Sequence, residues 1–224
     1  MKNNEHDQEE LEFEISEDLS EEILKKLGVK LPEPNDLTAA MIEHIERMGN
    51  RKIYLYDDVK PESILSVIYQ IHILEKKDPT KDIELIISSN GGYVVDCLAL
   101  IDVMDMSPCD FKVLVLGMAA SAACLIASNG TPGKRYAGKN AEFMFHEVRQ
   151  MIPEIKYSEI KYYLNDLKRT QKKFNKIFGH NTEKTEKEIQ QAFYGVANDR
   201  YMTATEARSF GIIDHVEMGK RVRK

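Results

Sequence analysis

Ser121 lies in a sequence context that could expose its hydroxyl for nucleophilic attack. The segment 117–123 (GMAASAA) follows an apolar run and precedes a helix of small residues. A hydroxyl at such a turn lies beside the free N–H groups of a helix N-terminus, which can stabilise an oxyanion. The same residues also fit a serine that only caps or packs the helix end. The local sequence leaves both roles open.

A serine nucleophile needs a base, and His146 is the best placed of the six histidines. It ends a strand-like segment, 142–145, and parallel sheets present functional groups at strand ends. A neutral imidazole there could take the serine proton. Asp199, followed by Arg200, could fix the tautomer of the imidazole. A histidine held by backbone partners and an Asp in a cap or surface ion pair are the alternatives.

The elements expected to position these groups alternate between short apolar strands and amphipathic helices. We expect strands at 52–56, 83–87, 111–116 and 142–145, and helices at 37–48, from 61, after the turn at 88–92, after 121 through 128, and at 157–178. Two short helices are expected at S/T-x-x-E capping boxes, Thr185 with Glu188 and Thr203 with Glu206. Repeated strand–helix–strand order requires crossover connections, which favour an α/β fold with a mostly parallel sheet.

Composition narrows the class of protein. With 224 residues and 42% hydrophobic content, one main domain is expected, and a net charge of −6 argues against nucleic-acid binding. No apolar run is long enough to span a membrane. The acidic N-terminus does not resemble a signal peptide, so we expect a cytoplasmic protein. Cys97, Cys109 and Cys124 lack ligand-like spacing and are expected to be buried free thiols, and no metal site is indicated.

The chain is expected to have three parts. Residues 1–36 are dense in Asp and Glu and end in LPEPND, which predicts a flexible acidic extension. A solvated tail, a partner-binding arm and a removed propeptide all fit this segment. Residues 37–217 form the main domain, and 218–224 a basic tail. Within the domain, the 157–178 helix carries an apolar stripe that is hard to bury within one subunit, so we expect oligomerisation: Ile160, Leu164, Leu167, Phe174 and Ile177.

Several motifs, in the same order, resemble ClpP, the peptidase of the Clp system, over about residues 50–217. They are KDIELIISSNGG (81–92), GMAASAA, GKR (133–135), FMFH (143–146), DRYMTATEA (199–207) and GIID (211–214). The resemblance implies a ClpP/crotonase-like fold of repeated β-β-α and β-α units, with a mostly parallel sheet and a protruding long helix. Several ordered motifs are far more specific than any one of them.

The resemblance also implies a serine endopeptidase. Ser121 would attack the peptide carbonyl, His146 would accept and return the proton, and Asp199 would orient the imidazole. The oxyanion would rest on the backbone N–H groups of Gly92 and Ala122, and the glycine pair would let a substrate backbone lie close. The chain itself would need no cofactor, because ATP would be used by a partner unfoldase.

Family members form stacked heptameric rings around a chamber that receives unfolded polypeptides, and their long helix makes the contact between rings. The 157–178 helix fits that role. Glu84 and Ile86 occupy positions where the family often has aromatic residues that receive loops of the Clp ATPase, so docking of ClpX or ClpA is predicted to be altered. Ala122 replaces a common Met, which predicts a changed specificity pocket, and the glycine-free segment 147–153 predicts altered threading of substrates and locking of rings.

Three other functions are compatible with parts of this pattern. A non-catalytic ring subunit would typically lack a member of the triad, whereas all three are present. A phage head-maturation peptidase would share the GMAASAA segment. An acyl-CoA enzyme of the related crotonase type would use a backbone oxyanion hole without needing Ser121, His146 and Asp199 together.

Overall fold

The computed structural model describes residues 39–149, 154, 156–193 and 199–217. The chain divides into two compact units, residues 1–46 and 47–224. The boundary falls within the first described helix, α2 (Ala39–Gly49), which corresponds to the helix predicted at 37–48. The predicted acidic extension at 1–36 and basic tail at 218–224 lie outside the described residues.

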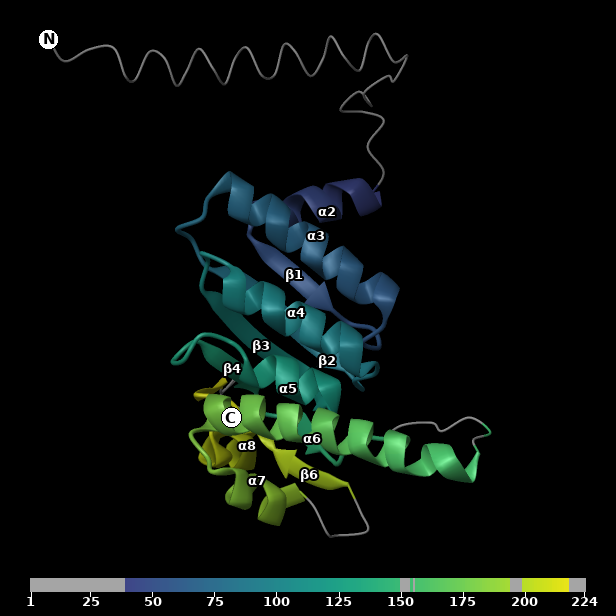
Figure 1. The fold of residues 1–224 in the computed structure, drawn as a ribbon. Coiled ribbons are helices and arrows are strands. Elements are labelled where there is room, and N and C mark those ends of the chain that lie inside the picture. The colour runs from purple at the N-terminus through teal and green to yellow at the C-terminus, as the bar shows by residue number, and fades with distance from the viewer. Residues whose placement is uncertain (1–38, 150–153, 155, 194–198, 218–224) are drawn as a thin grey trace, which may run out of the picture. The chain divides into compact units, whose positions relative to one another are not determined.

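A seven-stranded sheet forms the centre of the second unit (Figure 1). Its strands are β1 (Lys52–Leu55), β2 (Ile83–Ser89), β3 (Phe111–Ala120), β4 (Arg135–Gly138), β5 (Glu142–Phe145), β6 (Arg200–Thr203) and β7 (His215–Glu217). The main path runs β1-β2-β3-β4-β7 with parallel pairing throughout, while β5 pairs parallel with β3 and β6 antiparallel with β5. This sheet confirms the predicted α/β class; β4, β6 and β7 were not among the predicted strands.

Strand β3 belongs to two branches of the sheet. Residues 113–115 pair with β4, whereas residues 118–120 pair with β5, and Gly117 lies between them at a φ of 78°. Such a φ is readily adopted by glycine, which lets the strand bend from one partner to the other. The strand predicted at 111–116 is therefore longer than expected: it continues to Ala120 and ends immediately before Ser121.

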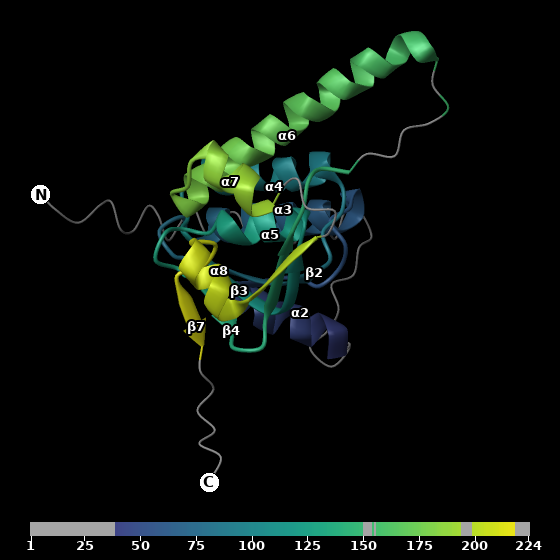
Figure 2. The same cartoon turned by 90° about the horizontal axis from the view of Figure 1, so that it is seen from below.

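Helices cover the sheet. They are α3 (Pro61–Lys77), α4 (Val94–Met106), α5 (Ala122–Ser128), α6 (Ile160–Thr182), α7 (Glu186–Phe193) and α8 (Ala204–Phe210), with a 3-10 turn at Tyr157–Glu159. In Figures 1 and 2, α3, α4 and α5 lie side by side over one face of the sheet. Both predicted capping boxes are confirmed, at Thr185 and Thr203, and all three cysteines are buried and free. No helix among the described residues is long and apolar enough to cross a membrane.

Helix α6 extends away from the rest of its unit (Figure 2). Near its C-terminal end, Phe174 and Phe178 are buried in the core. Towards its N-terminal end, Ile160 and Leu164 are 49% and 47% exposed, so the predicted apolar stripe is only partly covered within the subunit. An amphipathic helix with an uncovered apolar stripe is typical of a surface that contacts another protein.

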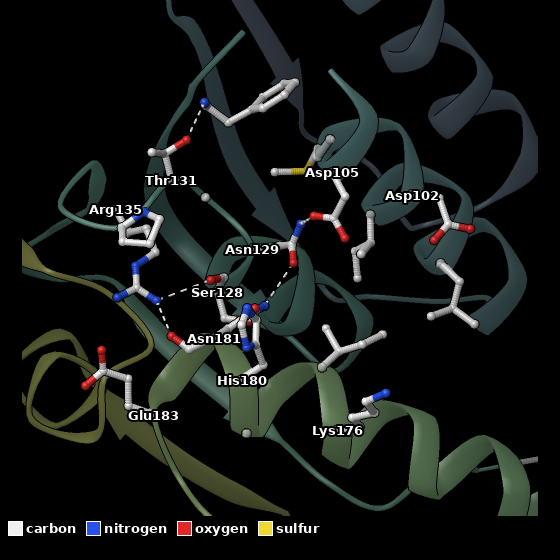
Figure 3. Close-up of a pocket in the computed structure, with 18 of the residues that line it drawn as sticks. Asp102, Asp105, Ser128, Asn129, Thr131, Arg135, Lys176, His180, Asn181 and Glu183 are labelled. Carbon is white, nitrogen blue, oxygen red and sulfur yellow. Dashed lines mark hydrogen bonds between the residues drawn. The ribbon is translucent and has the colours of Figure 1, made fainter. Parts of the chain in front are cut away.

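A buried arginine ties the base of α6 to the sheet. Arg135 donates to both carboxylate oxygens of Asp214, at 3.0 and 2.6 Å. It also donates to the carbonyls of Asn181 and Ser128, at 2.7 and 3.3 Å (Figure 3). Burial alone would raise the pKa of Asp214, but the hydrogen bonds and charge of Arg135 lower it below its usual value. The GKR and GIID segments singled out in the sequence therefore meet as a structural clamp.

We expect Arg135→Met to lower the free energy of unfolding by about 3–5 kcal/mol, because it leaves the Asp214 carboxylate partly buried without its cation. Chemical denaturation at pH 7 measures this. Lys112→Met, which removes a more exposed partner of Glu84, serves as control and should cost less than about 1 kcal/mol. Equal losses in the two variants would contradict the clamp.

Candidate active site

Ser121 lies at a sharp connection between a strand and a helix. It follows the last residue of β3 and precedes Ala122, the first residue of α5, with φ 52° and ψ −118°. A positive φ is strained for a residue with a side chain and is kept only where the surrounding structure fixes it. Here the Ser121 N–H donates to the Met144 carbonyl at 2.7 Å, which continues the pairing of β3 with β5. The strained turn is thus held by the sheet itself.

His146 follows β5, the strand that pairs with the end of β3. Because Ala120 lies opposite Met144 in the parallel register, the residues just beyond both strands meet at the same edge. The Nε2 atom of His146 lies 2.8 Å from the Oγ atom of Ser121. This is the distance at which an imidazole can accept the proton of an attacking hydroxyl.

Asp199 reaches the same site from the other side of β5. It immediately precedes β6, whose antiparallel register sets Arg200 opposite Phe145. Its Oδ1 atom lies 3.9 Å from the Nδ1 atom of His146, which is beyond hydrogen-bonding distance. Nδ1 is buried and has no hydrogen-bond partner among the described residues. The structure thus brings all three predicted residues together but hydrogen-bonds only the serine to the histidine.

Arg149 is a fourth residue of the site, and it was not predicted as one. Its guanidinium hydrogen-bonds Oδ1 of Asp199, the same oxygen that lies nearest to His146. The only sequence signal was a positive charge three residues after the histidine. Partial burial lowers the pKa of His146 below its ordinary value; the charge of Arg149 lowers it further, and Asp199 opposes both. The imidazole is therefore neutral at neutral pH, as a general base must be.

A cavity of about 260 Å³ opens beside Ser121 and His146. Gly92 and Ala122, the predicted oxyanion-hole residues, line it together with these two side chains. The rest of its lining is mostly apolar and includes Val94, Met144, Phe145, Val148 and Phe174. The site therefore has a nucleophile, a base and candidate backbone donors around one small, largely apolar space.

The glycine pair is required by the protein's own backbone. A Cβ atom on Gly91 would lie 2.5 Å from the Ala120 carbonyl oxygen, and one on Gly92 would lie 2.2 Å from the Val59 carbonyl oxygen. Room for a substrate, the reason offered from the sequence, is thus not needed to explain the pair. The glycines allow residues 91–92 to pack directly against the turn that holds Ser121.

A second cavity, of about 1250 Å³, lies between α4, the end of α5 and the C-terminal part of α6 (Figure 3). It includes Ser128, but the hydroxyl of this serine donates to the Leu125 carbonyl at 2.7 Å and accepts from Asn181 at 3.1 Å. Both hydrogen bonds of the Ser128 hydroxyl therefore connect parts of the fold. The described residues contain no group of three or more His, Cys, Asp or Glu side chains placed to hold a metal ion.

Comparison with known proteins gives a family match over most of the chain. The family model described as Clp protease matches residues 38–220. The ATP-dependent Clp protease proteolytic subunit 2 of Corynebacterium efficiens is 34% identical over 169 residues, which cover 75% of this chain and 83% of that protein. The matched region contains the serine, the histidine, the aspartate and the glycine pair.

Proposed function

Because the chain belongs to the Clp protease family, we propose that it is a serine endopeptidase that cleaves unfolded polypeptides through an acyl-enzyme intermediate. The observation that carries the proposal is the 2.8 Å contact between His146 Nε2 and Ser121 Oγ beside the cavity. A non-catalytic ring subunit would have no need of this contact at a strained turn.

Each residue of the site has a role in the proposed reaction. Ser121 Oγ attacks the carbonyl carbon of the scissile peptide while His146 Nε2 takes its proton. The N–H groups of Gly92 and Ala122 stabilise the oxyanion. His146 then gives the proton to the leaving amine, and the acyl group stays on Ser121 until water, deprotonated by the same imidazole, releases it. Asp199 stabilises the imidazolium that forms in each step.

The lining of the cavity supports a preference for apolar side chains next to the cleaved bond. Val94, Met144 and Phe174 contribute hydrocarbon surface, and Ala122 leaves more room than a longer residue would. A substrate side chain buried there gains binding free energy in proportion to its apolar area.

Two exposed apolar stripes support assembly into stacked rings around a chamber. One lies on α3 and consists of Leu65, Tyr69 and Ile73; the other lies at the start of α6 and its preceding turn and consists of Tyr157, Ile160 and Leu164. Exposed stripes on two different helices fit two kinds of subunit contact, one within a ring and one between rings.

An ATP-driven unfoldase is the proposed partner, since the relative from C. efficiens is named as the proteolytic subunit of an ATP-dependent protease. Glu84 lies between Lys52 and Lys112 on neighbouring strands, at 3.6 and 3.0 Å. This charged row supports the prediction that the ATPase docks differently from the way it docks on aromatic family members. Ile86, two residues further along the same strand and on the same face as Glu84, is buried.

Labelling with a fluorophosphonate probe tests the proposed function. The full-length assembled protein should be labelled, and Ser121→Ala should abolish labelling. Ser209→Ala, which removes an exposed hydroxyl on α8, is the matched control and should be labelled like the native chain. An assembled native protein that is not labelled would contradict the peptidase and leave the non-catalytic ring subunit.

A further inference from the structure

One carboxylate oxygen in the site has two competing neighbours. Oδ1 of Asp199 is hydrogen-bonded by the guanidinium of Arg149, and the same atom lies 3.9 Å from His146 Nδ1. A carboxylate that pairs with an arginine is neutralised and held in the direction of that arginine. The aspartate is thus beside the histidine and directed to another partner.

The histidine is left incomplete by this arrangement. To accept a hydrogen bond from the Ser121 hydroxyl at Nε2, the neutral imidazole must carry its own proton on Nδ1. That atom is buried and has no hydrogen-bond partner among the described residues. A buried N–H without an acceptor is unfavourable, and it becomes more so when the ring takes a second proton during the reaction.

The segment that carries Arg149 is fixed to α6. The N–H of Val148 donates to Gln171 Oε1 at 2.7 Å, and Gln171 donates in turn to the buried Asn175 at 2.9 Å. The side chain of Arg149 is nevertheless 69% exposed. It can therefore leave Asp199 without disturbing the core, while its backbone stays in place.

We propose that Arg149 is a positioning residue that withholds the Asp199 carboxylate from His146 and so restrains the triad. The inference rests on the proposed function, because it assigns Arg149 a role in that same site. Two charged groups act on His146: Arg149, three residues further along the same segment, and Asp199, which precedes β6. The other neighbours are uncharged, namely the Ser121 hydroxyl between β3 and α5 and the Phe174 ring of α6. Release of Asp199 would complete the hydrogen-bonded triad.

The test compares Arg149→Gln with the native full-length chain in two measurements. The first is the pKa of His146 by NMR, assigned with His146→Gln. Removing Arg149 removes a positive charge that disfavours the imidazolium and frees a carboxylate that favours it, so the pKa should rise. The second is the rate of fluorophosphonate labelling at pH 8, where the imidazole is neutral in both proteins, and it should rise roughly 3- to 10-fold.

Two further variants separate the pairing of Arg149 with Asp199 from a general effect of charge. Arg149→Lys keeps the charge but loses the planar fork, so both measurements should lie between those of the native chain and Arg149→Gln. Arg208→Gln removes an exposed charge on α8 that neither lines the cavity nor acts on the pKa of His146, and it should change neither measurement.

An unchanged or lowered pKa of His146 in Arg149→Gln would overturn the inference, as would an unchanged or slower labelling rate while Ser121-dependent labelling persists. A native chain that is never labelled would overturn the proposed function instead. In that case the pKa values of His146 in Arg149→Gln and Arg149→Lys, compared by NMR, decide whether Arg149 withholds Asp199 from His146.

Discussion

His146→Gln should lower the rate of Ser121 labelling and of peptide cleavage by about 10³-fold or more, because the serine loses its general base. The 2.8 Å contact with Ser121 makes this the largest effect that we expect from a residue other than the nucleophile. Glutamine preserves much of the volume and a polar end, so the fold should be retained. The labelling rate under single-turnover conditions measures the loss.

The pH dependence of labelling identifies the base independently. In the native chain the rate should fall as pH decreases and the imidazole becomes protonated, with its midpoint below the ordinary pKa of histidine because burial and Arg149 lower the pKa of His146. His146→Gln should lose this acid limb. His72→Gln removes an exposed histidine that is paired with Glu75 on α3. This variant should keep both the native labelling rate and the fall of that rate at acid pH. A limb that survives in His146→Gln would assign the base to another group.

Gly91→Ala should both destabilise the protein and reduce labelling by more than about 10²-fold, because a misplaced reacting group costs rates of that order. The new Cβ atom would lie 2.5 Å from the Ala120 carbonyl oxygen and 2.9 Å from the Ala122 nitrogen, which are backbone atoms on both sides of Ser121. Those atoms must shift, and the free energy of unfolding should fall by about 3 kcal/mol or more.

Gly133→Ala is the matched control for Gly91→Ala. The two glycines have similar positive φ values, 83° and 90°, but a Cβ atom on Gly133 would meet no atom within 4 Å. The backbone strain of alanine is therefore common to both variants, at about 1 kcal/mol, and only Gly91→Ala adds the collision. Denaturation and labelling of the two proteins separate these contributions. Similar losses in both would show that the close approach at Gly91 is unimportant.

Much of the fold could be predicted from the sequence because hydrophobic periodicity and helix caps are local signals. Apolar spacing predicted α3, α4 and the long α6, and the capping boxes at Thr185 and Thr203 begin helices as expected. The misses have tertiary causes. Strands β4, β6 and β7 have only three or four residues each, and their hydrogen-bond partners lie in other segments of the chain: β4 pairs with β3, β6 with β5 and β7 with β4.

The sequence by itself pointed to three residues of the site, Ser121, His146 and Asp199, because the order of the motifs that carry them resembles that of a peptidase family; it gave no reason to include Arg149. Tertiary structure decided the distances and hydrogen bonds between these side chains. Only strand pairing sets the 2.8 Å contact between serine and histidine, and only the packed site shows Arg149 on the oxygen nearest to His146. A hydrogen bond depends on tenths of an ångström between segments distant in sequence, and no local pattern of residues encodes that distance.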